Sequence, residues 1–249
     1  MRIRARSRLL AGSGRTAAAA AALVPALALT AACGGGGGGK DAAPTPQGVR
    51  ASGAVSTAKL TQALLTSKDV SDVQVLPAGT KEQLLGDRQQ TDHPACQAVA
   101  DQWSSRPAHP RQVYVGAMLT DTAAKDKNAK TISLSVVASY TAGEAEQVLD
   151  DLTTSLKTCT SYSSTRNGTT TTYAVKAVPN TATYGDQQAT YTIGDSKAGP
   201  SGAVLVTVIR VGDATAAYET LRADHKPATL RSAIPLAQVA KLREAAKGS

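Results

Sequence analysis

The sequence predicts an α+β domain with a mostly antiparallel sheet, helices packed on one face, and one internal disulfide. Three observations lead to this prediction. Short runs of alternating apolar residues are joined by hairpin-length loops, which is typical of antiparallel strands. Helical spacing of apolar residues is confined to a few separate segments. Two cysteines, Cys96 and Cys159, fall within the part of the chain that carries these patterns.

The first 32 residues have the layout of an export signal. Five arginines precede an apolar, alanine-rich stretch from Ala17 to Leu29. Pro25 interrupts this stretch, which falls short of the roughly 20 residues that a membrane-spanning helix needs. We therefore expect residues 1–32 to be a lipoprotein signal peptide, cleaved between Ala32 and Cys33.

Cys33 is the expected lipidation site, because small residues precede it and a glycine run follows it. Its thiol would receive a diacylglycerol and hold the chain at the extracytoplasmic face of the cell membrane. Thr30 stands where such signals usually have leucine. The alternative is cleavage by an ordinary signal peptidase, which would leave a free thiol in a secreted protein.

The charge balance changes when the signal is removed. The whole chain has 27 basic and 19 acidic residues and a net charge of +8. Loss of five arginines leaves a charge of about +3 on the mature chain. No basic block or aromatic-basic stripe remains, so we expect no nucleic-acid partner.

Composition separates a tether from a folded domain. Residues 33–56 contain six consecutive glycines and the triplet Pro44-Thr45-Pro46, and they offer no apolar face to bury. We expect this segment to be a lipidated tether. Residues 57–249 are long enough for one domain with its own core.

Cysteine counting predicts a disulfide between Cys96 and Cys159, because Cys33 is assigned to lipid and the expected compartment is oxidising. The competing interpretations are a metal site and a catalytic thiol. Both lack support, since there is no Cys-x-x-Cys and the three histidines, His93, His109 and His225, are scattered. We predict no metal and no cofactor.

Periodicity and capping residues predict the helices. The clearest has Thr141 and Glu144 as a capping box, followed by apolar residues at helical spacing up to Cys159. The expected segments are 59–65 with Ser56 or Thr57 as cap, a helix from Pro94 through Cys96 and Val99 to Trp103, 142–158, 213–221 capped by Asp213, and 236–246.

Alternation and β-branched residues predict the strands. Asn167-Gly168 and Gly199-Pro200 mark turns between them. The expected strands are 113–119, 132–139, 170–178 with a partner before the Asn167-Gly168 turn, 188–193 and 203–211.

This order of elements resembles the PknH-like extracellular sensor domain, which occurs on actinobacterial serine/threonine kinases and on stand-alone lipoproteins. The likeness rests on the helix at Leu60–Leu65, the helical cysteine in Pro94-Ala95-Cys96, the strands at 113–119 and 132–139, and the capped helix before Cys159. It spans roughly Lys59 to Leu242. The resemblance implies an α+β fold with a central cleft that binds a small ligand. The kinase prototype has two cysteine pairs where this chain has one, and any sensing by this chain would need a partner.

The sequence gives only weak evidence for a catalytic motif. Ser56-Thr57-Ala58-Lys59 matches the Ser-x-x-Lys of penicillin-binding enzymes, but the accompanying motifs are missing and Ser56 is better explained as a helix cap. The pair Asp150-Asp151 is expected on a solvated helix face. We therefore predict no catalytic residue, and the sequence does not identify ligand-binding residues.

Two functions remain open. The first is a membrane-anchored, sensor-like lipoprotein that binds a small molecule or a cell-wall fragment. The second is a cell-surface structural or protein-interaction module without such a ligand. The sequence names no protein partner.

Overall fold

The computed structural model describes residues 55–166 and 168–247. The expected signal peptide, its cleavage site, Cys33 and the tether up to residue 54 lie outside the described residues. The folded unit already includes Val55, whose side chain is buried and whose backbone N–H donates to Ser139 Oγ at 2.7 Å. It therefore begins slightly before the expected position 57.

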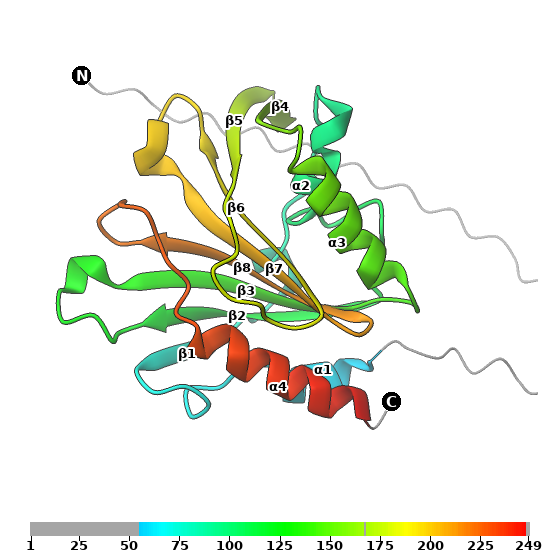
Figure 1. The fold of residues 1–249 in the computed structure, drawn as a ribbon, viewed down its shortest axis with the longest axis vertical. Helices are drawn as coiled ribbons and strands as arrows, with labels where there is room; N and C mark the ends of the chain where they lie inside the picture. The colour runs from blue at the N-terminus through cyan, green and yellow to red at the C-terminus, as the bar shows by residue number, and fades with distance from the viewer. Residues whose placement is uncertain (1–54, 167, 248–249) are drawn as a thin grey trace, which may run out of the picture. The chain divides into compact units, whose positions relative to one another are not determined.

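The described chain forms eight strands, four α-helices and four short 3₁₀ helices (Figure 1). The strands are β1 (Val73–Pro77), β2 (Val113–Asp121), β3 (Thr131–Ser139), β4 (Ser161–Arg166), β5 (Thr169–Ala177), β6 (Gln187–Asp195), β7 (Val204–Val211) and β8 (Ala214–Arg222). The α-helices are α1 (Thr57–Ala63), α2 (Gln97–Asp101), α3 (Glu144–Ser155) and α4 (Ala233–Lys247). The 3₁₀ helices are η1 (Lys81–Gln83), η2 (Pro94–Cys96), η3 (Lys127–Ala129) and η4 (Gly199–Gly202).

All eight strands belong to one sheet in the order β1-β2-β3-β8-β7-β6-β5-β4, and every neighbouring pair is antiparallel. Strand β8 is the last in sequence, yet it lies in the middle and joins β3 to β7. The sheet therefore forms only when the two halves of the chain meet. The predicted α+β class with an antiparallel sheet is confirmed.

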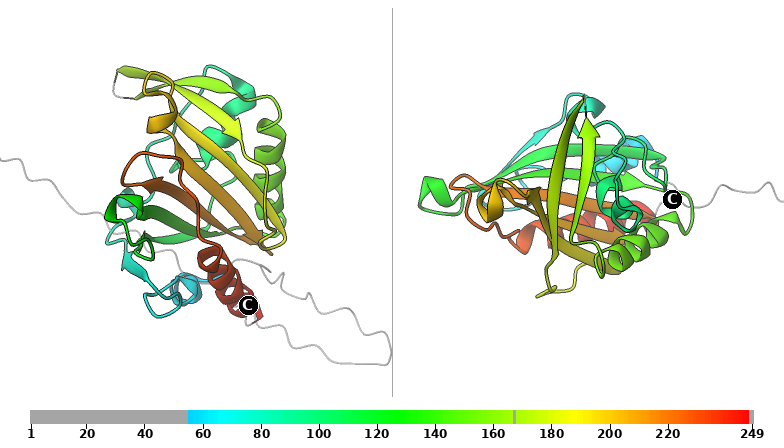
Figure 2. Two further views of the ribbon diagram at one scale, coloured as in Figure 1. Left: turned by 60° about the vertical axis from the view of Figure 1, so that its left-hand side comes forward. Right: turned by 90° about the horizontal axis from the view of Figure 1, so that it is seen from above.

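The helices cover both faces of the sheet in two pairs (Figure 1, Figure 2). Helices α1 and α4 pack together against β2, β3, β7 and β8, around Val137, Ala216 and Ile209. Helices α2 and α3 pack on the opposite face, around Ala217 and Val208. Neighbouring residues of a strand point to opposite faces, so alternating apolar residues in these strands feed two cores. The expectation that all the helices pack on one face of the sheet is wrong. Helices α1 and α4 cover one face, and α2 and α3 cover the other.

Residues 213–221 were expected to form a helix, and they form the central strand β8 instead. Gly212 has φ +57°, and Val211 pairs directly with Ala214 across a two-residue turn. A Gly-Asp turn between apolar runs is a hairpin signal. The prediction gave Asp213 a capping role, whereas its carboxylate accepts a hydrogen bond from Gly143 N at 3.0 Å.

Helix α3 begins at Glu144, later than predicted, and its N-cap is Gly143 with φ +84°. The expected capping box of Thr141 and Glu144 is absent, because the N-cap is Gly143 and not Thr141. Glu144 N donates to the backbone oxygen of Thr141 at 3.1 Å. Ser56 caps α1 as expected, accepting from Lys59 N. Strand β1 was not predicted.

The Cys96–Cys159 disulfide is present, as predicted, and spans 63 residues. Cys96 ends η2 directly before α2, and Cys159 lies shortly after α3. Ser155 Oγ also donates to Ala95 O, beside the disulfide. Covalent and polar links thus fix α2 against α3.

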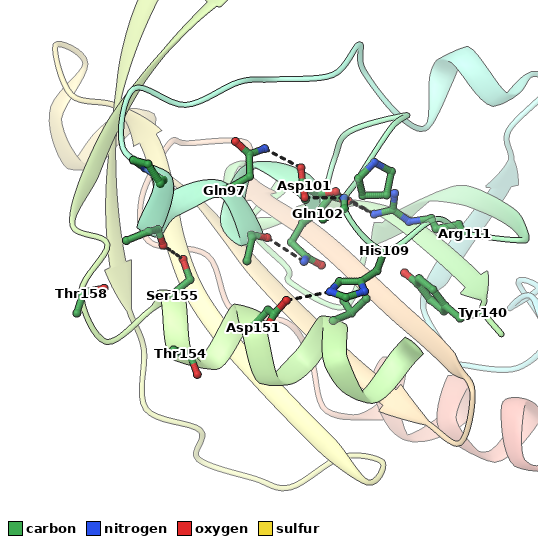
Figure 3. A pocket seen from close by; sticks show the side chains of 16 residues that line it. Gln97, Asp101, Gln102, His109, Arg111, Tyr140, Asp151, Thr154, Ser155 and Thr158 are labelled. Carbon is green, nitrogen blue, oxygen red and sulfur yellow. Dashed lines mark hydrogen bonds and ion pairs between the residues drawn. The ribbon is translucent and has the colours of Figure 1, made fainter. Parts of the chain in front are cut away.

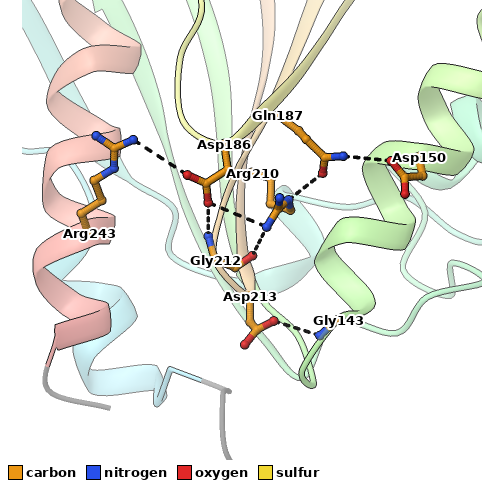
Figure 4. A network of polar contacts seen from close by, with 8 residues as sticks. All are labelled: Gly143, Asp150, Asp186, Gln187, Arg210, Gly212, Asp213 and Arg243. Carbon is orange, nitrogen blue, oxygen red and sulfur yellow. Dashed lines mark hydrogen bonds and ion pairs between the residues drawn. The ribbon is translucent and has the colours of Figure 1, made fainter.

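A polar network joins both helical layers to the β6–β7 hairpin (Figure 4). Arg210 Nε donates to Gln187 Oε1 at 2.6 Å, and Gln187 Nε2 donates to Asp150 Oδ1 on α3 at 2.9 Å. Asp186 accepts from Gly212 N at 2.7 Å and lies 3.9 Å from Arg243 on α4. Asp150 thus has a structural role.

Candidate functional site

Two sizeable cavities border the layer formed by α2 and α3. One, the helix groove, lies between α2 and α3 and is lined in part by Ala98, His109, Tyr140, Val148 and Asp151 (Figure 3). The other, the sheet cleft, lies between the sheet and the segment that runs from η1 to α2. Their volumes are about 300 Å³ and about 480 Å³.

In the helix groove, His109 bridges two carboxylates of α3. Its Nδ1 lies 2.6 Å from Glu144 Oε2. Its Nε2 lies 2.9 Å from Asp151 Oδ2, the contact drawn in Figure 3. Partial burial opposes the positive charge, but hydrogen bonds to Asp151 and Glu144 outweigh it and raise the pKa of His109. The imidazole therefore ties the loop before β2 to α3.

The other charged groups of the helix groove also serve the fold. Asp101 accepts from Gln97 Nε2 at 2.8 Å and from Ala108 N at 2.8 Å. The guanidinium of Arg111 donates to the backbone oxygens of Asp101, Gln102 and Ser104. These contacts satisfy the side chains internally, so the groove offers few free polar groups to a ligand.

The sheet cleft has its floor on the strands and its wall on α2. Leu134, Glu219, Val204 and Ile193 come from β3, β8, β7 and β6, and they point to the α2/α3 face. Val99, Ala100 and Trp103 come from α2 and the turn after it. The disulfide at Cys96 anchors this wall.

Glu219 is the charged group set into the floor of the sheet cleft. Its side chain is half-buried and has no hydrogen bond or ion pair to any described residue. Burial raises its pKa above the ordinary value. Such a carboxyl group costs folding free energy unless something else pairs with it.

Aromatic side chains surround this carboxyl group. Tyr162 and Tyr173 line the cleft with ring centroids 5.3 Å apart. Burial, then the neighbouring charges of Tyr173 and Glu219, raise the pKa of Tyr162. Burial, then Tyr162 and Glu219, likewise raise the pKa of Tyr191, whose strand partner Val206 is itself paired with Glu219.

Two polar atoms beside the cleft are buried without a hydrogen-bond partner among the described residues. They are Trp103 Nε1 and the hydroxyl of Tyr191, which lie near each other without reaching hydrogen-bond geometry. Natural interiors rarely leave such groups unsatisfied, and functional sites are a common exception.

Charged residues also stand at the rim of the sheet cleft. Glu82 and Arg166 are exposed, and Asp195 is half-buried. Arg166 lies beside Gly86, with Nη1 3.6 Å from where a Cβ would be. The cleft therefore has three carboxylates and one guanidinium among its described lining residues.

Sequence reasoning found the disulfide beside this site and missed the site itself. Glu219 was placed in an expected helix, where nothing marked it as special. The signal that could have located it is the Gly212-Asp213 hairpin turn, because that turn makes the following residues a strand and points Glu219 to the same face as Ala217.

Within the residues that the structure describes, no three His, Cys, Asp or Glu side chains are placed to hold a metal ion. His109, Glu144 and Asp151 do not converge, because the carboxylates contact opposite ring nitrogens. No helix in the same part of the chain has the length and hydropathy needed to cross a membrane.

The described domain matches a known family. The family model described as "PknH-like extracellular domain" matches residues 55–219, and this chain belongs to that family. It therefore carries an extracytoplasmic, sensor-like domain, as the resemblance implied.

A solved structure shows the same fold. The crystal structure of the extracellular domain of PknH from Mycobacterium tuberculosis matches with a TM-score of 0.52 at 11% identity, covering 79% of this chain and 98% of that one. Among curated proteins, none matches this sequence.

Proposed function

We propose that this domain binds a small extracytoplasmic ligand in the sheet cleft and acts as a non-catalytic sensor or binding module. The observation that carries the proposal is the carboxyl group of Glu219, which has no partner among the described residues and lies on the floor of a cavity of about 480 Å³. A folded protein retains a destabilising buried group more readily where that group has a function.

The size and lining of the cleft support binding. Small-molecule sites typically have volumes of about 300–1,000 Å³ and combine apolar walls with a few fixed polar groups. The sheet cleft has aliphatic and aromatic walls from Leu134, Val204 and Trp103 and a carboxyl group between them. The helix groove is smaller, and its charged side chains already have partners within the protein.

Native mass spectrometry of the domain purified from its own host tests this proposal, by detecting small molecules that copurify. Wild-type protein should carry a ligand that E219Q loses, while E244Q, changed at an exposed position on α4, should retain it. A ligand retained equally by E219Q would place binding elsewhere. If no ligand copurifies and a panel of lipids and cell-wall fragments shifts no cleft resonance, the proposal is wrong.

We further propose that Cys33 carries the lipid that holds the domain at the membrane, with the segment from Cys33 up to residue 54 as tether. The support is the order of residues in the sequence: arginines, an apolar stretch, small residues and then cysteine. Membership of an extracellular domain family is consistent with export. A domain so placed would meet ligands at or near the bilayer surface.

A further inference from the structure

The floor of the sheet cleft continues outward as a row of apolar side chains. Leu76 on β1 pairs directly with Met118 on β2, Met118 with Leu134 on β3, and Leu134 with Glu219 on β8. Directly paired residues of neighbouring strands share a face of the sheet. The four side chains therefore form one line across β1, β2, β3 and β8, the neighbouring strands labelled in Figure 1.

This line changes from buried to exposed along its length. Leu134 is half-buried and lines the cleft, Met118 is 40% exposed, and Leu76 is 71% exposed. Three strand spacings separate Glu219 from Leu76, which is about 14 Å. Ile132 and Leu221, themselves directly paired, flank this row on the same face.

The inner end of the line is suited to a cation. Glu219 is a half-buried carboxyl group, while Arg166, the one guanidinium of the described lining, is exposed to water. Charges in a shielded cleft interact more strongly than charges in water, so the inner carboxylate dominates. Trp103, Tyr162 and Tyr173 add aromatic faces, which attract ammonium groups.

From this juxtaposition we propose that the ligand of the sheet cleft is a single-chain cationic amphiphile. Its ammonium group sits beside Glu219 among the aromatic rings, and its apolar chain lies along Leu134, Met118 and Leu76. The inference rests on the proposed function, since it names the ligand class of the same cleft. It also explains why a half-buried carboxyl group and exposed apolar side chains stand in one row.

The test uses four probes. Decyltrimethylammonium, decyl maltoside and decyl sulfate are kept below their critical micelle concentrations, and tetramethylammonium represents the head group without a chain. Affinities come from calorimetry, and amide chemical shifts locate the site. We expect decyltrimethylammonium to bind at least about tenfold more tightly than the neutral and anionic chains. Shifts should follow the row from Glu219 to Leu76.

Matched variants separate the head from the chain. E219Q should abolish the preference for ammonium, whereas E82Q, at the exposed rim, should keep it. M118S and L76S should each weaken the binding of decyltrimethylammonium by about threefold to tenfold. Neither should change the affinity for tetramethylammonium. L236S, at an exposed leucine of α4 on the other face, is the control.

The outcomes distinguish this inference from the proposed function. Equal binding of the neutral or anionic chain in the cleft, or an E219Q protein that keeps its preference, overturns the ligand class and leaves cleft binding intact. Unchanged affinity in both M118S and L76S overturns the placement of the chain. If none of the probes binds, the ligand class is overturned. The proposed function falls as well if no ligand copurifies from the host and the panel of lipids and cell-wall fragments shifts no cleft resonance.

Discussion

Leu134 and Glu219 stand directly opposite each other on β3 and β8, so that an apolar side chain borders a carboxyl group that has no partner in the described chain. The pair joins the first and second halves of the described chain. It defines the floor of the sheet cleft, and the predictions about function depend on it.

Glu219 should make the ligand-free protein less stable as pH rises. Burial raises its pKa above the ordinary 4.5, so the folded state keeps the proton at pH values where the unfolded chain has released it. The resulting stability is fully present below 4.5 and is lost as pH rises through the raised pKa. E219Q should remove this loss and be more stable near neutral pH by about 1 kcal/mol, measured by denaturant titration.

The control for that experiment is E82Q, because the pKa of the exposed Glu82 is lowered by hydrogen bonds from its own backbone and from Thr80. E82Q should not gain stability at neutral pH. A wild-type stability that stays flat while pH rises from about 4.5 to 7 would contradict the role given to Glu219.

The disulfide should contribute about 4 kcal/mol to the free energy of unfolding, because it closes a loop of 63 residues. The double variant C96S/C159S should lose most of this amount, and it should also loosen the α2 wall of the sheet cleft. Chemical denaturation gives the first quantity, and hydrogen exchange of residues 97–103 gives the second. Unchanged exchange in this segment would show that packing alone holds the wall.

His109 should stabilise the protein mainly at mildly acidic pH. Its pKa is raised, so its contribution is complete below the ordinary 6.5 and is lost as pH rises through the raised value. H109Q should cost about 0.5–1 kcal/mol near pH 5.5 and almost nothing in alkaline buffer. H93Q serves as the control, and a pH-independent cost for H109Q would refute the charge-dependent bridge.

Gly116 should not tolerate a side chain. A Cβ at this position would lie 2.3 Å from Ser135 O and 2.6 Å from Leu84 Cδ2. G116A should therefore displace Leu84 and destabilise the protein by about 1–3 kcal/mol, as read from thermal unfolding. G79A, with nothing closer than 3.7 Å, should be nearly neutral.

C33S should abolish membrane anchoring if the lipidation proposal is right. In the host, wild-type protein should partition into the detergent phase, and the variant should be found in the aqueous phase. Intact mass should show an acyl increment on the wild type alone. A C33S protein that still fractionates with membranes would show that another feature anchors the chain.

The sequence determined much of the fold, because its signals are local. Alternating residues in 113–119 and 132–139 predicted β2 and β3, Ser56 capped α1, and cysteine counting paired Cys96 with Cys159. The β-branched residues and tyrosine over 170–178, together with the Asn167-Gly168 turn, predicted the β4–β5 hairpin. Each of these depends on neighbours in sequence or on the chemistry of one residue type.

Only the tertiary structure decided where the site lies. Residues 213–221 have small and mixed side chains that suit a helix as well as a strand, and pairing with both β3 and β7 makes them a strand. That pairing divides the helices between two faces and turns Glu219 toward Leu134 and Tyr162. A cleft made by residues from β3, β8 and α2 depends on long-range contacts, which leave no periodic trace in the sequence.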